Sequence, residues 1–145
     1  MATKQNNAYA SALAAFLSYR DGVVYGKKTT FDNDKLATIT PEEIVRYFNY
    51  KAYGTESPSP VDKPLHARAN YLMDIKKKIS YFMPLKEMSW HPITRQGNPT
   101  KSSKVNKVIK TIKKAEMRHE GKPSQATWPF SLNEFLSILD VVASV

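Results

Sequence analysis

The side chains that most often act in catalysis are few in this sequence and stand apart from one another. The three histidines, His66, His91 and His119, have neither the spacing of metal ligands nor an acidic cluster beside them. Glu42 and Glu43 are adjacent carboxylates, but in the first turn of a helix such a pair is explained by capping and by the helix dipole. The chain has no cysteine, which excludes thiolate ligands, cysteine nucleophiles and disulfides. We therefore expect no enzymatic activity, no cofactor and no metal site.

Basic residues are the one functional type that is both abundant and regularly spaced. The net charge of the 145 residues is +9, from 22 basic and 13 acidic groups. Residues 1–62 hold 7 of each, residues 63–122 hold 15 basic and 4 acidic groups (net +11), and residues 123–145 hold 2 acidic groups. Such a block either binds a polyanion or is a solvated surface. Over 101–122 only Glu116 and Glu120 offset eight basic groups, which favours the polyanion.

Four segments with helical periodicity have to position these charges, over about 7–20, 41–53, 65–83 and 103–119. The second has the clearest start, because Thr40, Pro41 and Glu43 form the pattern of a capping box, and Gly54 marks its end. The third includes Leu65 on its apolar side. The fourth places apolar residues from Val105 to Ala115 on one arc and its lysines on the opposite arc.

The remaining segments are expected to be loops, apart from a helix at the C-terminus. The stretch 85–102 is a long loop, and its apolar residues Met88, Trp90 and Ile93 are expected to pack against the body. A capping pattern at Ser131 precedes an apolar helix over 131–143. We expect an all-α bundle of four main helices in a domain over 1–122, then a linker and the short C-terminal helix over 123–145. No apolar run is long enough to span a membrane, and no signal peptide is visible.

The order of these helices resembles the N-terminal core-binding domain of tyrosine recombinases and phage integrases, which is a SAM-like orthogonal bundle of four helices. The resemblance covers nearly the whole chain and includes the run from Thr40 to Phe48, the linker from Gly121 to Ala126 and the segment from Phe130 to Leu136. The long loop and the segment from Gly97 to Thr100 look like recombinase-derived proteins of Crypton-type mobile elements. The chain stops before the arginine, histidine and tyrosine residues of the family's catalytic domain could appear, so the resemblance implies no strand cutting.

What the resemblance implies is clamping of double-stranded DNA, mostly through backbone contacts of two basic helices. From the helix at 65–83 the contacts would be His66, Arg68, Asn70, Lys77 and Lys78, and Arg20 would add one from the first helix. From the helix at 103–119 and the residue before it, they would be Lys101, Lys104, Lys107, Lys110, Lys114 and Arg118. DNA binding of this kind would place the protein inside the cell, and in the nucleus if the organism is eukaryotic.

The apolar segment 131–143 raises a second possibility. In a full recombinase it would pack on the catalytic domain, so in this chain it has to be buried elsewhere, either by folding back or by exchange between two copies in a homodimer. The alternative to DNA binding is therefore a homo-oligomeric scaffold for protein interactions that keeps the fold without DNA contact.

Overall fold

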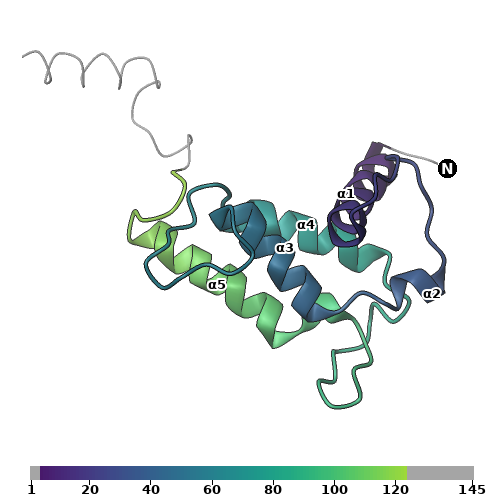
Figure 1. Ribbon diagram of the computed structural model, residues 1–145. Helices are drawn as coiled ribbons and strands as arrows, with labels where there is room; N and C mark the ends of the chain where they lie inside the picture. The colour runs from purple at the N-terminus through teal and green to yellow at the C-terminus, as the bar shows by residue number, and fades with distance from the viewer. Residues whose placement is uncertain (1–3, 124–145) are drawn as a thin grey trace, which may run out of the picture.

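The computed structural model describes residues 4–123, and in them it shows an all-α fold (Figure 1). The described part contains no strand, and its one isolated bridge pairs His91 with Gln96. The expected all-α class is confirmed, whereas the expected helix over 131–143 lies outside the described residues. The helices are α1 (Lys4–Asp21), α2 (Asn33–Leu36), α3 (Pro41–Tyr53), α4 (Ala69–Tyr81), the 3₁₀ helix η1 (Pro99–Lys101) and α5 (Ser103–Met117).

Local sequence signals set the ends of α3. The hydroxyl of Thr40 accepts a hydrogen bond from the backbone N–H of Glu43 at 3.3 Å, and the Glu43 carboxylate accepts one from the N–H of Thr40 at 2.9 Å. Gly54 ends the helix with φ of 77°, a left-handed conformation that suits glycine. The capping box and the glycine end predicted from sequence are both confirmed.

Helices α3, α4 and α5 pack side by side, and α1 crosses α3 and α4 at one end (Figure 1). The core between them is apolar and aromatic, and its largest fully buried side chains include Phe16, Phe48, Leu72 and Ile112. The apolar arc of α5 faces this core, with Val105, Ile109 and Ile112 buried. This packing leaves the opposite, lysine-bearing arc of α5 exposed.

Helix α4 begins at Ala69, four residues later than the sequence pattern indicated. Leu65, expected on the apolar face, is 55% exposed, because the chain there returns across the end of α3 with the N–H of His66 bonded to the carbonyl of Ala52. The first turn of α4 is capped from α5, since the Glu116 carboxylate accepts a hydrogen bond from the Ala69 N–H at 2.7 Å. A cap supplied from 47 positions away leaves no local sequence signal.

The loop between α4 and η1 projects from the body (Figure 1). The expectation that Ile93 packs against the body is wrong, because its side chain is 95% exposed at the turn between His91 and Gln96. Trp90 is half-buried and lies 5.3 Å from the Arg95 guanidinium. The fully buried residue of the loop is instead polar: Asn98 has no exposed surface.

Candidate nucleic-acid interface

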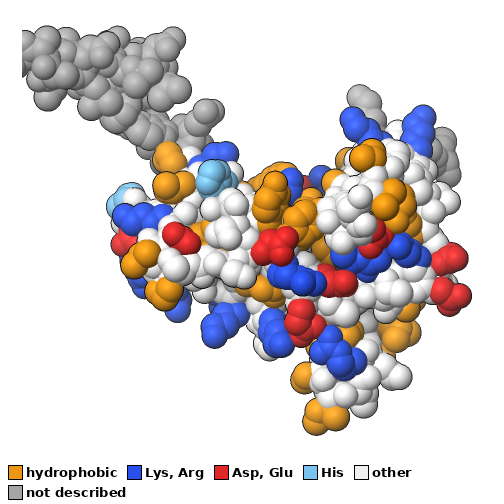
Figure 2. All heavy atoms as spheres, in the orientation of Figure 1, with side chains coloured by type: hydrophobic (Ala, Val, Ile, Leu, Met, Phe, Trp, Pro, Cys, Tyr) orange, Lys and Arg blue, Asp and Glu red, His pale blue; other side chains and the backbone are white. Residues whose placement is uncertain are grey.

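The exposed arc of α5 carries four lysines that we call the α5 lysine row: Lys107, Lys110, Lys113 and Lys114. All four are exposed, and none forms an ion pair or a side-chain hydrogen bond with another described residue. Figure 2 shows Lys and Arg side chains gathered along the lower edge of the molecule, over α5. The row exists because α5 buries its apolar arc against α3 and α4. Its ammonium groups are therefore free to meet an external anion.

Lys104, one turn before the row, is partly neutralised. Its ammonium lies 2.9 Å from one oxygen of Glu42, and the Arg95 guanidinium lies 2.6 Å from the other. These hydrogen bonds, that of Arg95 first, lower the pKa of Glu42 from 4.5 to about 2. Lys104 is 63% exposed and could still reach an anion, at the cost of sharing its charge with Glu42.

Helix α4 lies antiparallel beside α5, which brings some of the predicted residues together. Glu116 bonds Ala69 at one end of the pair, and the Lys76 ammonium donates to the side-chain oxygen of Asn106 at 2.6 Å nearer the other end. Lys77 is exposed and has no ion pair among the described residues, whereas Lys78 pairs with Asp74 at 2.7 Å.

Lys101, in η1, lies near the same end of α4. Lys101 and Lys77 line a common groove, and burial together with the charge of Lys101 lowers the pKa of Lys76. Positive charge is therefore concentrated where α4 ends and α5 begins.

Three further predicted residues meet in a separate groove at the other end of this helix pair. His66, Arg68 and Asn70 line it, but the expectation that a helix carries all three is wrong for the first two, which precede α4. The Arg68 guanidinium donates to the backbone carbonyl of Lys122 and pairs with Glu116 at 3.3 Å. Arg68 thus joins segments of this protein to one another, while His66 and Asn70 remain exposed.

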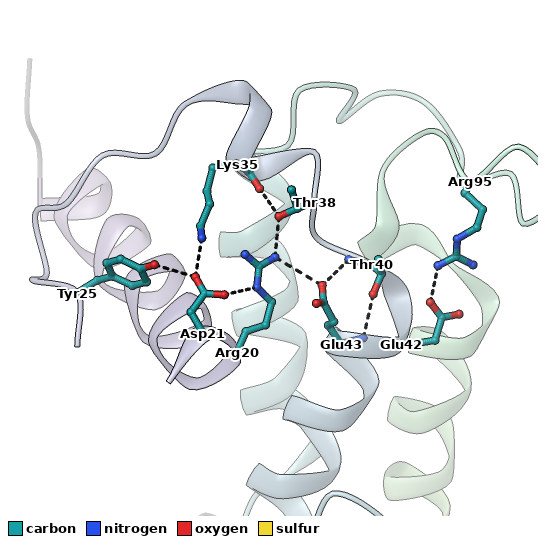
Figure 3. A network of polar contacts seen from close by, with 9 residues as sticks. All are labelled: Arg20, Asp21, Tyr25, Lys35, Thr38, Thr40, Glu42, Glu43 and Arg95. Carbon is teal, nitrogen blue, oxygen red and sulfur yellow. Dashed lines mark hydrogen bonds and ion pairs between the residues drawn. The ribbon is translucent and has the colours of Figure 1, made fainter. Parts of the chain in front are cut away.

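Arg20 is held within a network that connects α1, α2 and α3 (Figure 3). Its guanidinium contacts Asp21 at 2.8 Å, the Thr38 hydroxyl at 2.9 Å and Glu43 at 3.5 Å, and only 11% of its side chain is exposed. Hydrogen bonds from Arg20, Lys35 and Tyr25 lower the pKa of Asp21 well below its usual range. These contacts leave Arg20 little freedom to reach a phosphate.

The remaining predicted residue, Arg118, is the exposed C-cap of α5. The prediction missed other basic residues that the fold brings to the same surfaces. Lys113 follows Lys110 at helical spacing and could have been found from the pattern. Lys51 of α3 and Lys122 line the groove of His66, and Lys86 lines that of Lys77, but no local pattern connects any of them with these partners, which belong to other segments.

The described residues show no feature of a metal centre or of a membrane span. Within 4–123 no group of three or more histidine, aspartate or glutamate side chains is arranged to hold a metal ion. In the same range no helix is long and apolar enough to cross a membrane. Comparisons of the chain with protein-family models, with curated proteins and with solved structures gave no match.

Proposed function

We propose that this protein is a non-catalytic module that binds double-stranded DNA, clamping it through the basic surfaces of α4 and α5. The observation that carries the proposal is the α5 lysine row, four exposed cations with no carboxylate partner among the described residues. A helical surface kept only for solubility normally mixes both signs of charge.

The dimensions of the row suit a phosphate backbone. Lys114 follows Lys107 by seven positions, a rise of about 10 Å along the helix axis. Duplex DNA carries about one phosphate per 1.7 Å of its own axis, so several phosphates come within reach of flexible lysine side chains. Each contact releases condensed counterions, and five to seven contacts, with Lys77, Lys101 and Arg118 added to the row, give strong binding at low salt. Such contacts position a protein on DNA without selecting a base sequence.

The resemblance to the core-binding domain of tyrosine recombinases supports the same function by analogy. It rests on the order of α1, α3, α4 and α5, and the SAM-like arrangement and the relation to Crypton-type elements are parts of this proposal. The proposed surface omits Arg20 and Arg68, because both guanidinium groups are held by carboxylates of the protein itself. A nuclear location follows from the proposal if the organism is eukaryotic.

The test is charge reversal with a matched control. The triple variant K107E/K110E/K114E changes the net charge from +9 to +3, and so does K27E/K28E/K63E, which alters three exposed lysines outside the proposed surface. Fluorescence anisotropy with a labelled duplex at about 50 mM salt should show binding by the native protein and the control, and little or none by the α5 variant.

Salt dependence gives a second measurement on the native protein. We expect log K to fall with log salt concentration at a slope of about −4 to −6. Equal weakening by the two triple variants would mean that net charge alone is responsible, and a flat salt plot or no binding would refute the DNA function. The alternative, a homo-oligomeric scaffold, rests on residues 131–143, which lie outside the described residues.

A further inference from the structure

A basic groove lies at the C-terminal end of α4, where four segments of the chain meet. Its volume is about 300 Å³. Helix α4 contributes Lys77, Ser80 and Tyr81, the following loop contributes Lys86, and η1 contributes Lys101. Tyr9 of α1 and Glu87 complete the lining. The groove is distinct from the α5 lysine row, none of whose residues lines it.

The buried side chain of Asn98 holds the walls of this groove in place. Its amide nitrogen donates to the Ser80 hydroxyl oxygen at 2.7 Å and to the backbone carbonyl of Lys86 at 3.1 Å. Its side-chain oxygen accepts hydrogen bonds from the N–H and the hydroxyl of Thr100, and its own carbonyl accepts one from the N–H of Lys101. One fully buried residue thus fixes, through its side chain and its carbonyl, the backbone at two of the groove's lysines, and it orients the hydroxyl of Ser80.

The groove is rich in donors and positive charge. Lys77, Lys86 and Lys101 oppose one carboxylate, that of Glu87, and no ion pair joins any of the four to another described residue. The Ser80 hydroxyl already accepts from Asn98, and its own proton has no hydrogen-bond acceptor among the described residues.

One of the groove's lysines, Lys86, also contacts its aromatic wall. The Lys86 ammonium lies 5.1 Å from the centre of the Tyr81 ring, and that ring packs edge-on against Tyr9 at 5.2 Å. A cation–π contact steers the ammonium while leaving its hydrogens available for an anion. The neighbouring Lys76 ammonium donates to Asn106, and its lowered pKa reflects both its burial and the charge of Lys101.

We propose that this groove is a phosphate-binding site, in which Lys77, Lys86 and Lys101 neutralise the phosphate oxygens and the Ser80 hydroxyl donates a hydrogen bond to one of them. A phosphate group matches the lining because it offers several acceptor oxygens and more than one negative charge. The phosphate belongs either to a nucleic acid strand or to a free phosphorylated compound, and both present the same group to the groove. The site does not depend on the α5 lysine row.

The first experiment uses inorganic tripolyphosphate as the probe, titrated into the full chain by isothermal calorimetry. We expect the variant K86Q/K101Q to bind it at least about tenfold more weakly, because two charge-assisted hydrogen bonds are lost. The control K110Q/K113Q removes the same number of charges from α5 and should retain nearly native affinity. Loss of binding in S80A, with native thermal stability, would separate the hydroxyl's contact with the ligand from a role in folding.

Lysines close to a helix C-terminus also stabilise the helix, and this role makes a different prediction. If stability were their only role, K86Q/K101Q would lower the melting temperature and leave tripolyphosphate binding unchanged. That result would overturn the proposed phosphate site. So would an absence of tripolyphosphate binding by the native protein, or equal losses of affinity in the variant and the control.

Duplex DNA then distinguishes the two sources of phosphate. The single variant K86Q is used here, because Lys101 is also a proposed DNA contact. If the groove holds a DNA phosphate, K86Q weakens binding of the duplex and tripolyphosphate competes with the duplex on the native protein. If it holds a free phosphorylated compound, K86Q leaves duplex binding unchanged, because Lys86 is not among the proposed DNA contacts, while tripolyphosphate binding is still weakened. Tripolyphosphate binding that depends on Lys86 and Lys101, in a protein that binds no DNA, would support the groove and refute the proposed DNA function.

Discussion

Glu42 joins three parts of the molecule through one carboxylate. It lies in the first turn of α3, where a negative charge is favoured by the helix dipole. One oxygen contacts Arg95 of the projecting loop and the other contacts Lys104 of α5 (Figure 3 shows the Arg95 contact). The loop therefore has a charge-based attachment to the helices in addition to the buried Asn98.

This attachment should depend on pH in a defined direction. Because the folded-state pKa of Glu42 is about 2 against 4.5 for the free group, its contribution to stability is complete above pH 4.5 and is lost as pH falls toward 2. We expect Glu42→Gln to lower the melting temperature by a few degrees at pH 7, a small effect because the pair is partly exposed. The difference between native and variant protein should shrink below pH 4.5.

Thermal melts followed by circular dichroism between pH 2.5 and pH 7 measure that difference. Glu87→Gln is the control, because Glu87 is exposed and has no ion pair among the described residues. A difference between native protein and Glu42→Gln that stays constant over this pH range would show that the charge of Glu42 is not what matters.

At the residue scale, sequence showed which side chains are basic but not which of them are already engaged. Arg20 and Arg68 resembled DNA contacts, yet each guanidinium lies against a carboxylate, Glu43 and Glu116 respectively, from another helix. These partners are 23 and 48 positions away, so no local pattern connects them. The α5 lysines were predictable as exposed, because a helical period fixes which side is buried.

At the scale of elements, the ends of a helix were predicted well where its capping residues are close to it in sequence, and poorly where they come from another element. Helix α3 carries its own capping box and its own C-terminal glycine, and it was predicted nearly to the residue. Helix α4 takes its N-terminal cap from Glu116 of α5, and its start was misplaced by four residues. The loop before η1 is folded by Asn98, a polar residue that hydrophobicity arguments assign to the surface.

Gly97 is the element-scale position at which a single methyl group should have a large effect. It has φ of +112°, and a Cβ there would lie 2.1 Å from the backbone oxygen of Ser89. We expect Gly97→Ala to destabilise the protein by about 2 kcal/mol or more, because both the backbone conformation and the loop segment around Ser89 have to change.

Urea denaturation of native protein, Gly97→Ala and Gly26→Ala tests this. A Cβ on Gly26 would meet only the Thr29 hydroxyl, at an ordinary 3.6 Å, so that variant should differ from the native protein by no more than about 0.5 kcal/mol. Equal stability of the two variants would contradict the packing described around Gly97. Because Asn98 follows directly, Gly97→Ala should also weaken tripolyphosphate binding if the groove is a phosphate site.

At the scale of the whole molecule, the net charge of +9 divides among surfaces that differ in what they can do. The α5 lysine row is a convex helix surface, the groove at the end of α4 is an open hollow lined by four segments, and Arg68 beside His66 is occupied by Glu116. Composition predicts that the molecule attracts anions, and only the fold separates cations that stabilise the protein from cations that are free to bind. The all-α class needed no tertiary information, because it follows from helical periods along most of the chain.

Oligomeric state is the whole-molecule property on which the scaffold alternative depends. The segment 131–143 carries seven large apolar residues, and exchange of this segment between two copies would bury them in a homodimer: Leu132, Phe135, Leu136, Ile138, Leu139, Val141 and Val142. We expect the full chain to sediment as a dimer, and a chain ending at residue 130 to sediment as a monomer that keeps its helical circular dichroism. The variant Leu136→Asp, which places a charge among apolar residues, should dissociate the dimer without shortening the chain.

The same number of chains per particle before and after truncation would refute the exchange. A lower melting temperature with no change in that number would instead indicate that the segment folds back on its own bundle. If the shortened monomer still binds duplex DNA with a steep salt dependence, DNA binding does not require the dimer, and the scaffold alternative loses its argument.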